Sequence, residues 1–173
     1  KEIGALPADI ADAIATACDE VLAGRYHDQF PVNVFRGCGT SINMNVNEVL
    51  GNRANELLTG HKGTDRVHPN THVNMCQSSN DLFPTAASLV LYRETGGLLD
   101  ALATLEAAVR ERMEALGPVV RIGRTCLQDA VPLTFGQSLS GYASLLERTR
   151  AQIAAFRKRS ATGILGATAV GTG

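Results

Sequence analysis

Residues 135–156 read FGQSLSGYASLLERTRAQIAAF, and this stretch is the strongest indicator of the fold. Its inward-facing positions alternate spacings of four and three residues: Phe135, Leu139, Tyr142, Leu146, Thr149, Ile153 and Phe156. That spacing places all of them on one side of a continuous helix. Such a seam is typical of a helix that packs against other long helices. We therefore expect a mainly α-helical fold, a bundle of long helices.

A second long helix is expected upstream, over about residues 79–117. Ser79 or Asn80 suits its N-cap, and Pro84 falls in the tolerated first turn. A helical stripe follows, made of Leu91, Leu98, Leu102, Leu105, Val109 and Leu116. Residues 118–134 begin with β-branched side chains and continue with Gly, Asp and Pro, so we expect an irregular loop between the two helices.

The N-terminal part contains shorter elements. An amphipathic helix is expected over residues 6–23, and another over about residues 42–59, closed by Gly60. Between them, residues 25–39 indicate an extended segment and a tight glycine turn. Residues 60–77 are polar and contain Gly and Pro, which predicts a loop.

Composition excludes several classes of partner. The 173 residues include 16 basic and 17 acidic side chains, interspersed without the basic face that nucleic acid binding needs. No apolar stretch approaches the roughly 20 residues that cross a bilayer, so no membrane partner is expected. The four cysteines form no C-x-x-C pair, which indicates reduced thiols in a cytoplasmic protein.

Three segments at helix ends combine glycine with small hydroxyl and amide side chains: GCGTS (37–41), QSSND (77–81) and GRTCLQD (123–129). Free backbone N–H groups and the helix dipole favour anions at such places. Convergence of these loops would form a pocket of neutral donors suited to carboxylates, made by Thr40, Ser78, Ser79, Asn80 and Thr125. Any one loop could equally consist of caps and turns alone, and without the site the chain fits a helical structural or interaction module.

Three asparagines alternate with apolar residues directly after GCGTS: Asn43, Asn45 and Asn47. Asparagine is a poor residue within a helix and is costly to bury unpaired. We expect these side chains to satisfy neighbouring loops and helices rather than to touch a ligand. Asn43 and Asn47 share one helix face, which fits a rigid support for Thr40.

Three stretches resemble signatures of the aspartase/fumarase superfamily of lyases: GCGTSINMNVNEVL (37–50), HVNMCQSSNDLFPTA (72–86) and IGRTCLQDAVPLTFGQ (122–137). The resemblance covers essentially the whole chain. It implies the end of an N-terminal helical domain over residues 1–78 and the start of a central long-helix bundle domain over residues 79–173. It also implies a homotetramer whose active sites are shared between subunits.

Members of this family resemble one another in metal-independent β-elimination that releases fumarate. Carried over by position, Thr40, Ser78 and Ser79 hold the carboxylate next to the carbon that loses its proton, where prearranged donors stabilise the developing charge. Asn80 contacts the leaving group, and Thr125 contacts the other carboxylate. No cofactor or metal is implied, and the histidines make no recognisable ligand set: His27, His61, His68 and His72.

The resemblance makes Thr125 and Cys126 the candidate catalytic residues, although related enzymes commonly have histidine or glutamine at the position of Cys126. Cysteine is smaller and a weak donor, and a thiol that only fills the loop is the alternative. His68 and Asn70 match a secondary anion site of fumarases, with a solvated loop histidine as the alternative. The family's serine base and lysine would lie beyond Gly173, so we expect a piece of a longer protein that is inactive alone.

The choice of lyase depends on small differences. Five features resemble aspartases: DQFPVNV (28–34), TSIN (40–43), Met75-Cys76, Ala130-Val131 and GATAVGTG (166–173). Two resemble fumarases: VHPN (67–70) and Ser78-Ser79. The balance favours an aspartate ammonia-lyase that converts L-aspartate to fumarate and ammonia. Fumarate hydratase is the first alternative and an inactive structural member the second, and the partner is a small dicarboxylate or amino acid.

Overall fold

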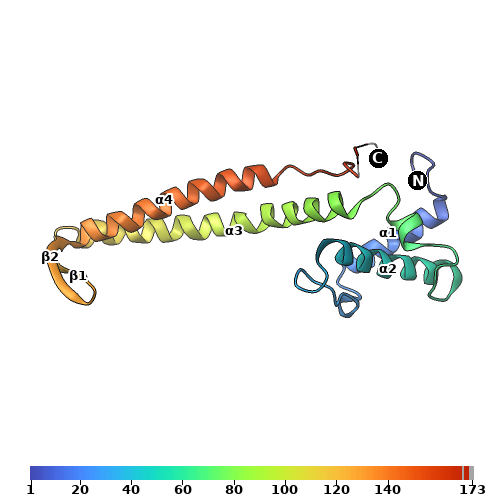
Figure 1. The fold of residues 1–173 in the computed structure, drawn as a ribbon, viewed down its shortest axis with the longest axis horizontal. Coiled ribbons are helices and arrows are strands. Elements are labelled where there is room, and N and C mark those ends of the chain that lie inside the picture. The colour runs from blue at the N-terminus through green and yellow to red at the C-terminus, as the bar shows by residue number, and fades with distance from the viewer. Residues whose placement is uncertain (169, 172–173) are drawn as a thin grey trace. The chain divides into compact units, whose positions relative to one another are not determined.

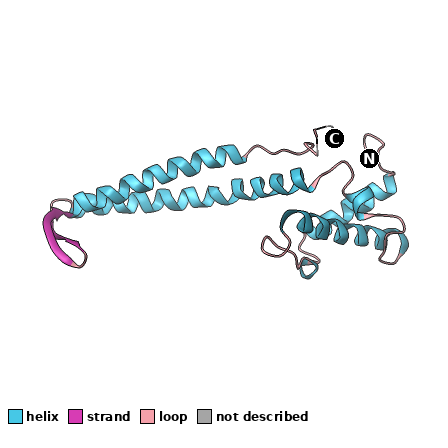
Figure 2. Ribbon diagram, in the orientation of Figure 1, coloured by secondary structure: helices cyan, strands magenta, loops and turns pink. Residues whose placement is uncertain are grey.

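The computed structural model of the chain describes residues 1–168, 170 and 171. The elements in order are α1 (Ala8–Leu22), a 3-10 turn η1 (His27–Gln29), α2 (Cys38–Thr59), a π-helical turn η2 (Pro69–Val73), α3 (Ser79–Leu116), β1 (Val120–Thr125), β2 (Gln128–Thr134) and α4 (Phe135–Ser160) (Figures 1 and 2). The predicted, mainly helical fold is confirmed. Across the described part of the chain, every helix is too short or too polar to cross a bilayer.

The chain forms two compact units. The first unit contains Lys1–Ala87 and Gly163–Gly173, and the second contains Ser88–Thr162. Helix α3 begins in the first unit and continues into the second. The family domain boundary expected between residues 78 and 79 stays a prediction, and the segment 166–173 lies partly outside the described residues.

The core of the first unit lies where α1 packs on α2. Its buried side chains are Ile10, Ala13, Ala54 and Val67. Beside them, Asn55 is buried and binds the loop after α2: its Nδ2 donates to the carbonyl oxygens of Gly63 and Val67, and its Oδ1 accepts from the N–H of Arg66 at 2.9 Å. One amide therefore fixes a polar loop against the helix, and the loop ends in the η2 turn.

Helix α2 begins four residues earlier than the sequence predicts, at Cys38 instead of Ile42. Gly37 has a φ of 104°, and a Cβ at this position would lie 2.6 Å from the Cβ of Ser41. The turn is therefore completed at Gly37, and Thr40 lies in the first turn of the helix. At the other end, Gly60 has a φ of 84° and closes the helix as predicted.

In the second unit, α3 and α4 lie side by side and antiparallel (Figure 1). Buried Glu106 of α3 accepts from Arg110 at 2.9 Å and from Arg150 of α4 at 3.1 Å. Further along, the Arg157 guanidinium lies 4.0 Å from the centre of the Tyr92 ring. Ionic and cation–π contacts thus join the two helices.

The predicted seams of these helices are only partly covered. On α4, five seam residues are half-buried: Phe135, Leu139, Leu146, Thr149 and Ile153. On α3 the expected stripe divides, since Leu102 and Val109 are half-buried while Leu91, Leu98 and Leu105 are 44%, 47% and 51% exposed. These three leucines, seven residues apart, are called the leucine row below. The row lies uncovered in the single chain.

The prediction of an irregular loop over residues 118–134 is wrong, because β1 and β2 pair there as an antiparallel hairpin (Figure 2). The two-residue turn is Cys126-Leu127, with φ values of 49° and 63°. Such turns are usually signalled by Asn-Gly or Asp-Gly, and this one is not. A register shift between Ile122 and Arg124 interrupts the alternation of the first strand, which further hid the hairpin.

Candidate active site

The N-terminal turns of α2 and α3 meet within the first unit. The Nδ2 of Asn43 on α2 donates to the Oγ of Ser79 on α3 at 2.8 Å. Gly39 lies against the Phe83 ring, where an added Cβ would be 3.2 Å from a ring carbon. Two helix N-termini, each with free backbone N–H groups, therefore lie together.

The asparagines of α2 hold this junction. Asn43 and Asn47 are buried, and both donate to the Oδ1 of Asn74 at 3.1 Å. Asn45 donates to the carbonyl oxygen of Gln29 at 2.9 Å. The donor groups of these side chains therefore satisfy neighbouring segments as predicted, whereas the buried Oδ1 of Asn45 has no hydrogen-bond partner among the described residues.

Ser78, not the expected Ser79 or Asn80, caps α3. Its Oγ accepts from the N–H of Asn80 at 3.2 Å, and its own N–H donates to the Oδ1 of Asp81 at 3.1 Å. A hydroxyl that accepts a hydrogen bond still has its proton to donate. The Oγ of Ser79 accepts from Asn43 in the same way, so both serines can offer an O–H to a ligand.

Sequence reasoning missed Asp81, which is buried with 1% of its surface exposed. Its Oδ2 accepts from the N–H groups of Gly166 at 3.1 Å and Thr168 at 3.0 Å. The N–H of Thr168, with those of Ser78, Leu82 and Gly166, lowers the pKa of Asp81 although burial opposes the shift. The signal in the sequence was Ser78-x-x-Asp81, a serine cap followed by an acidic residue at the third helical position.

His68 and Asn70 are exposed at the η2 turn. The Nδ1 of His68 accepts from the N–H groups of Asn70 at 3.2 Å and Thr71 at 3.3 Å. A neutral ring that accepts at Nδ1 carries its proton on Nε2, which leaves that N–H as a donor. Both residues line a depression of about 340 Å³ together with Met44, Glu48, Asn52, Thr64 and Pro69.

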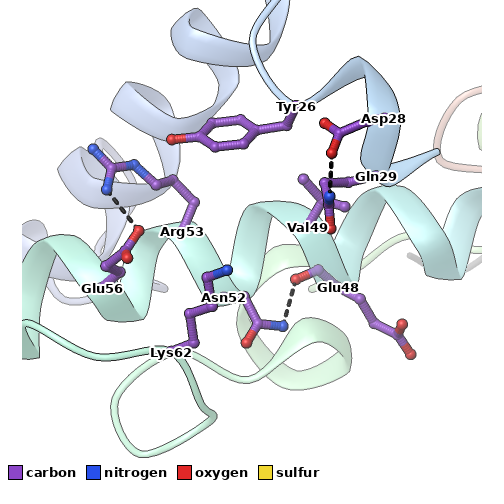
Figure 3. A pocket seen from close by; sticks show the side chains of 9 residues that line it. All are labelled: Tyr26, Asp28, Gln29, Glu48, Val49, Asn52, Arg53, Glu56 and Lys62. Carbon is purple, nitrogen blue, oxygen red and sulfur yellow. Dashed lines mark hydrogen bonds and ion pairs between the residues drawn. The ribbon is translucent and has the colours of Figure 1, made fainter.

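A second depression, of about 370 Å³, also has Glu48 and Asn52 in its lining and is shown in Figure 3. Arg53 lines it, but its guanidinium pairs with Glu20 at 2.6 Å and with Glu56 at 2.8 Å. The hydrogen bond from Arg53 lowers the pKa of Glu20. The positive charge of Arg53 is already paired with these two carboxylates, so it contributes little to binding a carboxylate ligand in this depression. Within the described ranges, no three His, Cys, Asp or Glu side chains gather as metal ligands would.

The predicted site residues divide between the two units. The first unit holds Thr40, Ser78, Ser79, Asn80, His68 and Asn70. The second holds Thr125 and Cys126, both exposed at the end of the β1–β2 hairpin, where Thr125 pairs with Gln128 across the turn. Within one unit, the structure therefore brings together the serine turn and the start of α2, without the hairpin residues.

The described chain thus combines a hairpin of long helices with hydroxyl groups at two joined helix N-termini, which can donate to a carboxylate. A family model described as "Lyase" matches residues 1–173, and the chain belongs to this family, within the aspartase/fumarase superfamily.

Individual relatives are more specific. The chain is 49% identical to the class II fumarate hydratase of Bordetella parapertussis over 175 residues, 99% of this chain and 38% of that protein. It is 46% identical to the class II fumarate hydratase of Bacillus subtilis over 178 residues, 100% of this chain and 38% of that protein. The crystal structure of class II fumarase from Schistosoma mansoni matches with a TM-score of 0.81 and 43% identity, over 99% of this chain and 36% of that one. The chain thus spans little more than a third of these proteins.

These relatives overturn the expectation of an aspartate ammonia-lyase, since proteins 46–49% identical over the whole chain are fumarate hydratases. Short resemblances of this kind do not separate the two lyases, because they are spread over unlike elements of the chain. DQFPVNV (28–34) belongs to a connecting segment, and Ala130-Val131 lies exposed on β2. The fumarase-like features His68 and Ser78-Ser79 carry hydrogen-bond donors, but so does the aspartase-like TSIN (40–43), which contains Thr40.

Proposed function

We propose that the protein carrying this chain is a class II fumarate hydratase, which interconverts malate with fumarate and water. The observation that carries the proposal is the identity of 46–49% over the whole chain to fumarate hydratases. The joined N-termini of α2 and α3 add physical support, because they provide the donors that a carboxylate substrate requires.

The serine turn is the proposed subsite for the carboxylate next to the carbon that loses its proton. Ser78 and Ser79 each accept a hydrogen bond from the protein and direct their own protons to the ligand, and Thr40 adds a third hydroxyl from α2. When the proton leaves, charge accumulates on this carboxylate. Donors fixed beforehand stabilise that charge without reorganising, which is where they lower the barrier most. Asn80 would contact the leaving hydroxyl.

The β1–β2 hairpin carries the remaining residues of the proposed active site. Thr125 would bind the second carboxylate, and Cys126 would stand near the leaving water, where family members commonly carry histidine or glutamine. A thiol donates only weakly, so we expect the wild-type protein to be slow for its family. This substitution also favours one further candidate function, a member of the family that keeps the bundle and has lost catalysis.

His68 and Asn70 form the proposed secondary anion site. The support is the ring geometry: Nδ1 is occupied by two backbone N–H groups, which leaves the Nε2 proton for an anion. Glu48 lines the same depression and repels a dianion. We therefore expect weaker binding here than at the serine turn.

We propose that the protein is a homotetramer whose active sites combine residues from several subunits. The support is the leucine row, since Leu91, Leu98 and Leu105 form a periodic apolar stripe on a long helix and are exposed in one chain. A cytoplasmic location is proposed from the cysteines, which are free in the structure.

The test is an ultraviolet assay of fumarate with malate, aspartate and argininosuccinate offered separately, with a chelator present. Of the three substrates, only malate should yield fumarate. Turnover of aspartate but not malate would overturn the proposal, and no turnover of any substrate would favour the inactive structural member.

A further inference from the structure

We propose that Asp81 is a positioning residue that clasps the serine turn to the segment of residues 163–168. The clasp rests on the proposed function in one respect, because it deepens the account of the carboxylate subsite. Asp81 is given no substrate contact. Its role is to keep the hydroxyl groups of the turn where the substrate meets them.

The geometry of the carboxylate carries the proposal. Its Oδ1 accepts from the N–H of Ser78 at 3.1 Å, and its Oδ2 accepts from the N–H groups of Gly166 and Thr168 at 3.1 and 3.0 Å. The two oxygens thus bind two segments that lie far apart in the sequence. Because the side chain is buried, water cannot replace either set of bonds at low cost.

Thr85 forms a second point of the clasp one helical turn later. Its side chain is buried, and its Oγ1 accepts from the N–H of Ile164 at 3.0 Å. Gly163 packs so closely that an added Cβ would lie 2.7 Å from the Cγ2 of Thr85. Residues 81 and 85 share one face of α3, so the segment is held at two points along the same helix.

The consequence for the site follows from Ser78. Its N–H is held by Asp81, while its Oγ accepts from Asn80 in the same turn. Loss of the carboxylate would release the backbone of this turn and the segment opposite it together. Donors that must reorganise stabilise a developing charge less well, so turnover should suffer more than substrate binding.

The informative variant is Asp81→Asn, which keeps the volume and replaces one acceptor oxygen by an NH2 group. That group would face N–H donors whichever way it turned, because both oxygens of Asp81 accept from backbone N–H groups. The matched control is Asp19→Asn, the same chemical change at an exposed carboxylate on α1 of the same unit. Thr85→Val, which keeps the shape and removes the Oγ1 acceptor, is the second variant.

Malate turnover, thermal unfolding and hydrogen exchange of peptides covering residues 78–85 and 163–168 are measured on the complete protein. For Asp81→Asn we expect kcat to fall at least about 30-fold and KM to change less than about threefold. Exchange in the two peptides should accelerate at least about tenfold, with other peptides unchanged. Thr85→Val should lower kcat and accelerate exchange in the two peptides by about threefold each. Asp19→Asn should change neither quantity.

Several outcomes overturn the proposal: unchanged exchange in both peptides, accelerated exchange with unchanged kcat, or acceleration across the whole protein with a matching loss of Tm. If Asp81→Asn does not fold, Thr85→Val decides by the same criteria. If the wild-type protein turns over no substrate, the proposed function fails separately. The clasp is then decided by exchange alone, where acceleration confined to the two peptides supports it and no acceleration overturns it.

Discussion

Buried polar side chains have different hydrogen-bond partners in the two units. In the first, single side chains such as Asn55 and Asp81 each satisfy several backbone groups from distant loops, and a small apolar core is enough to hold them. In the second, buried Glu106 joins two helices through arginines, while the leucine row remains exposed. The first unit therefore holds its loops through buried polar side chains, although apolar residues such as Phe35 (94%) and Leu22 (84%) are exposed on it, and the second presents a periodic apolar row suited to further helices.

The most direct test of this contrast is to place charge on the leucine row. In the double variant Leu98→Glu with Leu105→Glu, like charges would prevent apolar helices from packing across the row. We expect a smaller particle by light scattering. If the sites are shared between subunits, turnover should fall at least about 100-fold, as it does when a catalytic group is misplaced. Glu94→Gln with Glu111→Gln, exposed positions on the same helix, is the control. A stable tetramer in the charged variant would contradict the assembly proposal.

The next effect should come from the first unit. Ser79→Ala removes one donor from the proposed carboxylate subsite, and kcat should fall about 100-fold, as for the loss of one donor to a developing oxyanion. Fumarate absorbance measures it. Ser144→Ala, at an exposed serine of α4 in the second unit, should retain wild-type rates. A loss below about threefold in Ser79→Ala would remove this serine from the site.

The hairpin of the second unit provides a test in the opposite direction. Cys126→His should raise kcat about tenfold, because imidazole both donates and accepts protons near neutral pH and a thiol does so weakly. Cys126→Ser, similar in size to the wild-type residue, should stay within about threefold of it. Equal rates for the two variants would mean that Cys126 only fills the turn.

The smallest effect concerns the ion pairs between α3 and α4. Arg110, then Arg150, lowers the pKa of Glu106, so the folded pKa lies below the unfolded value of about 4.3. The stabilisation is therefore present above about pH 4.3 and is lost as pH falls through the folded pKa.

Glu106→Gln should lower Tm by a few degrees at pH 7 and flatten its decline in acid, as measured by calorimetry. Glu147→Gln, at a 61% exposed partner of Arg110, should change Tm by less than about 1 °C. Equal effects of the two variants would show that burial of Glu106 adds nothing.

Periodicity predicted the helices because a long amphipathic pattern rarely belongs to any structure but a helix, although it could not tell which face meets which partner. Thr95 and Glu106 are buried in the second unit, whereas Leu98 and Leu105 are exposed. A search for apolar stripes follows the leucines and passes over the buried polar residues. Which stripe is covered depends on neighbours that a single sequence does not reveal.

The geometry of the candidate site could be anticipated only in part, for a similar reason. Ser78, Ser79 and Thr40 stood out as hydroxyl groups at helix starts, and the structure joins those starts through Asn43. Asp81 was missed because its partners, Gly166 and Thr168, are backbone groups far along the chain. The similarity to fumarate hydratases was missed because aspartase-like features outnumber fumarase-like ones in this chain, and one of them, TSIN (40–43), contains the candidate site residue Thr40.

The left-handed backbone of Cys126 and Leu127 has a consequence for protein engineering. Asparagine followed by glycine adopts this turn with little strain, so such a tip should stabilise the hairpin at the expense of the thiol. Two libraries at these positions, one selected for heat resistance and the other for turnover, would converge on different tips if the thiol position takes part in catalysis. Their divergence would measure how strongly folding and chemistry compete for the same two residues.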